Sequence, residues 1–171
     1  KGKTIFVGDT SVHEYPTSEQ MAEIAISASR VVRLFGFDPK VAFVSHSTFG
    51  QPLTSRTKHI KNAVEILKKK NVNFEFDGDM QPDVALDKEY QSLYPFSKIV
   101  GNANILIMPG QHSAAISYKM MKTLGDTKVI GPLLIGLGLP IEIAPLRSST
   151  SEILNLASIA AYSSDVIDYK K

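Results

Sequence analysis

The chain has no cysteine among its 171 residues. Disulfide bonds and thiolate chemistry are therefore excluded, and because this composition fits a reducing compartment, we expect a cytoplasmic protein. No apolar run approaches the roughly 20 residues that a membrane-spanning helix needs. The formal net charge of +2 is too small to indicate a nucleic-acid or membrane-surface partner.

The composition is that of an ordinary globular chain, with 43% hydrophobic and 21% charged residues. Its length is enough for one domain with a proper core. The first residues, Lys1 to Thr4, lack the form of a signal peptide and contain no initiator methionine. We therefore expect this chain to be a piece of a longer polypeptide.

Segments with the pattern of strands alternate with segments of helical periodicity along the chain. The alternation predicts an α/β protein with a parallel sheet and right-handed crossovers. Apolar residues spaced three and four apart predict the inward faces of the helices. The predicted strands are residues 4–7, 41–44, 74–77, 105–108 and 141–144. The predicted helices begin after an N-cap at Thr17 or Ser18, at about Ser55, at Val84, after the N-cap Ser113, and after Ser149. The predicted inward residues are Met21, Ile24, Ala25, Ala28, Val32 and Phe35, then Ile60, Ala63, Val64 and Leu67, then Ile116, Met120 and Leu124.

The segment of residues 45–50, Ser-His-Ser-Thr-Phe-Gly, follows an apolar strand and precedes a helix. In α/β sheets, ligands bind at the carboxyl ends of strands, beside helix N-termini. The hydroxyls of Ser45, Ser47 and Thr48 therefore either bind a ligand or satisfy backbone groups of the turn. Adjacent residues on an extended chain point to opposite sides, so Ser45 and His46 are not expected to face each other as a nucleophile and its base.

No metal site is predicted. Asp77, Asp79 and Asp83 lie within seven residues and offer oxygen ligands for Mg²⁺ or Ca²⁺, but the spacing does not fit a calcium loop and a turn is favoured. The four histidines have neither metal-ligand spacing nor a carboxylate partner nearby in the sequence. They are His13, His46, His59 and His112.

Basic residues lie along the predicted second helix. Without interleaved aromatic residues they indicate a solvated face rather than a nucleic-acid site. The last three complement the C-terminal end of the helix dipole. They are Arg56, Lys58, Lys61, Lys68, Lys69 and Lys70.

Six segments, in one order over nearly the whole chain, resemble the phosphate acetyl/butyryltransferase family. They are PTSEQMAEIA (16–25), FGFDPKVA (35–42), DGDMQPDVAL (77–86), ANILIMP (103–109), SYK (117–119) and IGPLLIGL (130–137). Three further details resemble one branch, the transferase-like domain at the C-terminus of bacterial NADP-dependent malic enzymes. They are SHSTFG (45–50), YPFS (94–97) and the tail around 149–156.

This resemblance implies a parallel-sheet, three-layer α/β sandwich, similar to the isocitrate/isopropylmalate dehydrogenase-like fold. The family module has two subdomains with coenzyme A in the cleft between them, and it is longer than this chain. Residues 1–171 would be its C-terminal part, with 1–130 mostly the second subdomain and 131–171 returning to the first. The N-terminal half, which supplies arginines to the active cleft, would be missing.

The resemblance also bears on catalysis. Active members carry a Ser-Arg pair before the last helix and an Asp in its first turn, where this chain has Pro145, Leu146 and Glu152. Proline and leucine side chains neither donate to a phosphate nor stabilise an oxyanion. Arg147, one residue later, is a possible substitute if the loop shifts. Glu152 keeps a carboxylate, but Ser149 and Glu152 also form the pattern of a helix capping box, which is the favoured reading.

We therefore expect a domain that is silent as a transferase and that binds acetyl-CoA or CoA between loop 45–50 and loop 147–149. Lys119 would lie towards the nucleotide, or else face solvent. The candidate ligand-binding residues are Ser45, Ser47, Thr48, Gly50, Lys119, Arg147, Ser148 and Ser149. No metal or cofactor is expected in this domain; NADP and a divalent metal would belong to the malic-enzyme domain.

Three functions follow as hypotheses. The first is allosteric regulation of a malic enzyme that converts malate to pyruvate in the same chain. The second is a fragment of an active phosphate acetyltransferase, and the third is a structural oligomerisation module. The nearly all-apolar last helix must be covered on several sides, so we also expect a two-fold homodimer.

Overall fold

The computed structural model describes residues 3–9, 11–125 and 127–166, with the side chains of 165 and 166 excepted. The chain divides into two compact units, Lys1–Tyr118 (unit 1) and Lys119–Lys171 (unit 2). The predicted subdomain boundary lay near residue 130. Whether these units correspond to the two predicted subdomains stays a prediction.

Unit 1 is built on a parallel four-stranded sheet, as the alternating pattern predicted. The strand order is β1-β4-β2-β3, and every neighbouring pair is parallel. The strands are β1 (Phe6–Gly8), β2 (Lys40–Val44), β3 (Glu75–Met80) and β4 (Ile105–Ile107). Because β4 lies between β1 and β2, two of the three crossovers skip a strand.

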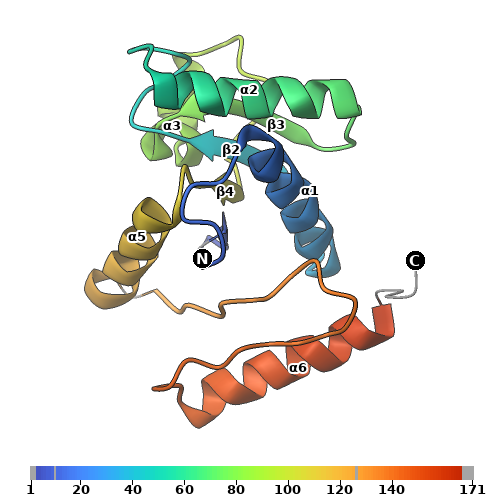
Figure 1. The fold of residues 1–171 in the computed structure, drawn as a ribbon. Helices are drawn as coiled ribbons and strands as arrows, with labels where there is room; N and C mark the ends of the chain where they lie inside the picture. The colour runs from blue at the N-terminus through green and yellow to red at the C-terminus, as the bar shows by residue number, and fades with distance from the viewer. Residues whose placement is uncertain (1–2, 10, 126, 167–171) are drawn as a thin grey trace. The chain divides into compact units, whose positions relative to one another are not determined.

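Helices cover both faces of this sheet. The helices are α1 (Ser18–Leu34), α2 (Ser55–Lys70), α3 (Pro82–Leu86), α4 (Lys88–Ser92) and α5 (Gln111–Leu124). Successive residues of β2 alternate between two cores: Val41 and Phe43 pack with α1 and α2, while Ala42 and Val44 pack with α3 and the start of α5. Figure 1 shows α1 and α2 beside the strands. The expected three-layer α/β architecture is confirmed.

Local sequence signals set the ends of α1 and α2. The Thr17 side chain accepts from the amide of Gln20, whose own side chain reaches back in a capping box. Thr54 and Thr57 form the same arrangement at α2. All four predicted inward residues of α2 are buried, as are four of the six of α1, whereas Phe35 is 41% exposed.

Three predictions about the strands and caps are wrong. β3 continues to Met80, so Gly78 and Asp79 lie in a strand rather than in a turn. Ser113 lies inside α5 instead of capping it, because the helix already begins at Gln111. Residues 141–144 form no strand; their alternating apolar pattern has no neighbouring strand with which to pair among the described residues.

Unit 2 contains the end of α5, an irregular apolar segment and α6 (Thr150–Val166). The predicted inward stripe of α5 is exposed: Ile116, Met120 and Leu124 are each more than half accessible. No helix in the described part of the chain is long and apolar enough to cross a membrane.

Candidate functional site

The carboxyl edge of the sheet in unit 1 contains a topological switch point. The chain leaves β1 and β2 for helices on one face, and it leaves β4, which lies between them, for α5 on the other face. The loops after neighbouring strands therefore diverge at β4. In open α/β sheets this is where a crevice for ligands forms.

The loop after β2 is held by one buried carboxylate. Asp79, 2% exposed, accepts the amide hydrogen of Gly50 at 3.0 Å and the hydroxyl hydrogen of Ser47. Its backbone carbonyl also accepts the amide of Phe49 at 2.6 Å. Strand β3 thus fixes a loop that lies some thirty residues earlier in the sequence. Sequence reasoning considered Asp79 only as a metal ligand or turn residue and missed this role.

The predicted ligand hydroxyls of this loop are buried and used within the protein. Ser45, Ser47 and Thr48 are 7%, 0% and 7% exposed. The Thr48 hydroxyl accepts from the amide of Gln81 at 3.2 Å, and the Ser45 amide donates to the carbonyl of Met80 at 2.9 Å. These contacts match the hypothesis that the loop satisfies its own backbone groups. A direct contact between these hydroxyls and a ligand stays a prediction.

His46 is the exposed member of the loop. Its Nδ1 lies 3.5 Å from the Ser45 hydroxyl, which in turn lies 3.2 Å from the Ser47 hydroxyl. The expectation that Ser45 and His46 do not face each other is therefore wrong. The chain bends at residues 46 and 47 instead of staying extended, so the alternation of side chains does not hold there.

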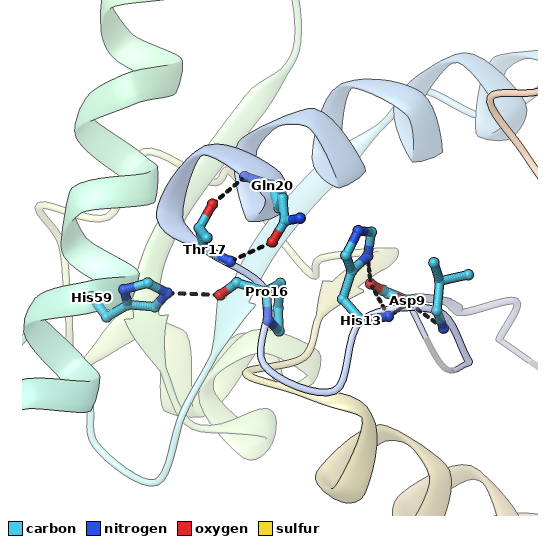
Figure 2. A network of polar contacts seen from close by, with 7 residues as sticks. Asp9, His13, Pro16, Thr17, Gln20 and His59 are labelled. Carbon is cyan, nitrogen blue, oxygen red and sulfur yellow. Dashed lines mark hydrogen bonds and ion pairs between the residues drawn. The ribbon is translucent and has the colours of Figure 1, made fainter.

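The loop after β1 is organised by Asp9. Its carboxylate accepts from the amide of Val12 at 2.9 Å and contacts Nδ1 of the His13 ring (Figure 2). Asp9 has a left-handed backbone, with φ of 51°. The expectation that no histidine has a carboxylate nearby in sequence is wrong, because Asp9 lies four residues before His13. That spacing was the available signal.

His59 joins α2 to the start of α1. Its Nε2 lies 2.8 Å from the Pro16 carbonyl, directly before the Thr17 cap (Figure 2). The Ser18 hydroxyl donates to the His59 carbonyl at 2.9 Å. This histidine holds two helices together, which is a structural role.

The other two carboxylates of segment 77–83 accept hydrogen bonds from backbone amides. Asp77 accepts from Gly78 at 3.0 Å and from Lys98 at 2.8 Å. Asp83 accepts from its neighbour Val84 at 2.9 Å. Among the described residues, no group of three or more His, Cys, Asp or Glu side chains is placed to hold a metal ion.

Two details that resemble the malic-enzyme branch meet in space. Phe49 of the 45–50 loop packs against Tyr94 and Phe96 of the YPFS segment, with ring centroids 5.5 and 4.8 Å apart. Phe96 is 64% exposed. An aromatic cluster therefore adjoins the loop that Asp79 holds.

In unit 2, the predicted residues lie in the turn before α6. Arg147 and Ser149 are exposed and Ser148 is half-buried. Ser149 and Glu152 form the predicted capping box: Glu152 accepts from the Ser149 amide at 2.8 Å, and the Glu152 amide donates to the Ser149 hydroxyl at 3.3 Å. The favoured capping role is thus confirmed.

The Glu152 carboxylate is also stabilised in its charged form. The hydrogen bond from the Ser149 amide, then the contact with Lys122 at 3.0 Å, lower the pKa of Glu152 to about 2. By contrast, burial raises the pKa of Glu142, although its carboxylate accepts from the Leu134 amide at 3.1 Å. Lys119, on α5, is exposed.

Comparisons with known proteins give a consistent result. The family model described as Phosphate acetyl/butaryl transferase matches residues 1–161. An NADP-dependent malic enzyme from Rhizobium meliloti is 46% identical over 95% of this chain, which spans 21% of that relative. A phosphate acetyltransferase from Clostridium acetobutylicum is 36% identical over 91% of this chain, which spans 47% of that relative. The solved EutD phosphotransacetylase from Staphylococcus aureus superposes with a TM-score of 0.89 and 29% identity, over 96% of this chain and 52% of that one.

Proposed function

Because the chain belongs to the phosphate acetyl/butaryl transferase family, we propose that it is the transferase-like domain of an NADP-dependent malic enzyme and regulates that enzyme by binding acetyl-CoA. The domain itself does not transfer acetyl groups. Oxidative decarboxylation of malate is carried out elsewhere in the same polypeptide, where NADP and a divalent metal bind.

Two features of the turn before α6 support catalytic silence. The Glu152 carboxylate is occupied by the capping box of α6. Its two oxygens already accept from Ser149 and Lys122. The positions of the family's Ser-Arg pair hold Pro145 and Leu146, which offer no donor to a phosphate.

Ligand binding is supported separately within each unit. In unit 1, the loop after β2 lies at a switch point of the sheet and is rigidly held by Asp79. In unit 2, the exposed Arg147 and the start of α6 offer a cation and amides that favour negative charge. Coenzyme A carries a diphosphate and a further phosphate, so it suits such groups.

The proposal is tested on the intact protein by two assays. The first measures acetyl phosphate formation from acetyl-CoA and phosphate, and we expect none; turnover of about 1 to 1,000 per second would make the domain an active transferase. The second measures malate turnover against acetyl-CoA concentration, together with calorimetric titration. Binding of acetyl-CoA with no change in malate turnover would reject the regulatory role.

The exposed apolar side chains of α6 favour association as a second role. Ile153, Leu154 and Tyr162 are each about half or more exposed. An apolar helix face of this kind is normally covered by another surface. We propose a two-fold homodimer, and sedimentation that shows only monomer at micromolar concentration would reject it.

A further inference from the structure

We propose that Asp79, acting through Ser47 and Ser45, holds His46 as the Nδ1–H tautomer, and that the ring thereby presents its Nε2 lone pair as a hydrogen-bond acceptor to a donor group of a coenzyme A ligand. The proposal rests on the proposed function for its ligand, but its geometry is independent of it. It concerns only residues of unit 1.

The series of contacts begins at the buried carboxylate of Asp79. An ionised carboxylate can only accept hydrogen bonds. Asp79, 2% exposed, faces two donors, the amide of Gly50 at 3.0 Å and the hydroxyl of Ser47. The single hydroxyl hydrogen of Ser47 is therefore committed to Asp79.

Each of the next two contacts can have either partner as the donor, and the contact with Asp79 favours one direction. Ser47 has no second hydrogen, so at the 3.2 Å contact between the two hydroxyls Ser45 must be the donor. Ser45 has then also used its hydrogen. At the 3.5 Å contact, the longest of the series, we infer that Nδ1 of His46 carries the hydrogen and donates to Ser45.

The hydrogen on Nδ1 determines the state of the second ring nitrogen, Nε2. A neutral imidazole has one N–H and one acceptor nitrogen, so a hydrogen on Nδ1 leaves the lone pair on Nε2. His46 is exposed and lies at the carboxyl end of β2, beside the switch point of the sheet.

Such a nitrogen recognises an N–H, O–H or S–H group. Coenzyme A offers amide and hydroxyl donors in its pantetheine arm, and its acetyl ester keeps them. The thiol hydrogen is present only in the free coenzyme. Comparing CoA with acetyl-CoA therefore shows whether the donor is the thiol or a group that both molecules keep.

The tautomer is tested first and without ligand. The intact protein, labelled with ¹⁵N in histidine, is studied by magic-angle-spinning NMR at about pH 8.5, where histidines are generally neutral. The His46 signals are assigned by their loss in His46→Gln. We expect an unprotonated Nε2 in the wild type and in the serine control Ser92→Ala, and loss of this preference in Ser45→Ala. A wild-type ring with its hydrogen on Nε2 would overturn the proposal.

Binding is tested by calorimetric titration with CoA and with acetyl-CoA. His46→Phe, which lacks an acceptor, should weaken binding about 2- to 12-fold, and His46→Gln, which keeps a donor and an acceptor, should weaken it less. Equal weakening for both molecules would place the donor in a group that both keep, such as the pantetheine arm, whereas weakening for CoA alone would identify the thiol. Unchanged binding of both to His46→Phe would refute the acceptor role. If the wild type binds neither molecule, the proposed function fails, while the NMR result still decides the tautomer.

Discussion

The carboxylate of Asp79 in β3 accepts the backbone amide hydrogen of Gly50 across 3.0 Å. This contact ties the loop after β2 to the neighbouring strand. We expect Asp79→Ala to lower the free energy of unfolding by about 2–4 kcal/mol, because it leaves the Gly50 amide and the Ser47 hydroxyl unsatisfied in a buried site. Denaturant unfolding of the intact protein measures this. Asp83→Ala, which removes an exposed carboxylate that accepts from the amide of its neighbour Val84, is the control and should change stability little.

Gly78 comes directly before Asp79 in β3, at a position where an added side chain would collide with the neighbouring strand β2. Its φ is +151°, and an added Cβ would lie 2.7 Å from the Cβ of Phe43 and 2.8 Å from its carbonyl oxygen. Because a strand backbone cannot give way, Gly78→Ala should cost about 2–5 kcal/mol. Gly138→Ala is the matched control, since nothing lies within 4 Å of its added Cβ. Equal unfolding midpoints for the two variants would contradict the prediction.

Arg147 is exposed in the turn before α6. If it binds a phosphate of acetyl-CoA, Arg147→Ala should weaken binding about 10- to 150-fold, the effect of losing one charge-assisted hydrogen bond. Calorimetric titration of the intact protein measures it, with the exposed Arg30→Ala as control. Glu152→Gln should leave affinity nearly unchanged. Equal affinities for the wild type and Arg147→Ala would show that Arg147 is a surface residue without this role.

The capping box of α6 has a pH dependence whose sign follows from the pKa of Glu152. Folding lowers this pKa from 4.5 to about 2, so the carboxylate stabilises the helix start above about pH 4.5 and this stabilisation is lost as the pH falls towards 2. We expect Glu152→Gln to reduce hydrogen-exchange protection of α6 at pH 6. The difference from the wild type should shrink as the pH falls from 4.5 towards 2. A difference that is constant with pH would reject this assignment. Glu89→Gln, an exposed change in α4, should leave α6 unaffected at any pH.

Much of the fold was predictable because its signals are local. The cap at Thr17 and the buried face of α2 depend on residues three and four apart in one helix. The predictions failed where the deciding contact was distant. Residues 141–144 alternate like a strand, but no partner strand lies beside them in the described chain. The exposed stripe of α5, including Ile116 and Met120, has the period of a helix buried on one side, and periodicity alone does not say which surface covers it.

The sequence by itself determined the family, the alternation of strands and helices, and the capping box at Ser149 and Glu152. Only the tertiary structure decided that Asp79 serves the 45–50 loop, that Asp9 holds His13, and that Phe49 meets Tyr94 and Phe96. The physical reason is the parallel sheet. It aligns the carboxyl ends of strands that are far apart in the chain, so the partners of a loop are set by strand order, which no local pattern of residues encodes.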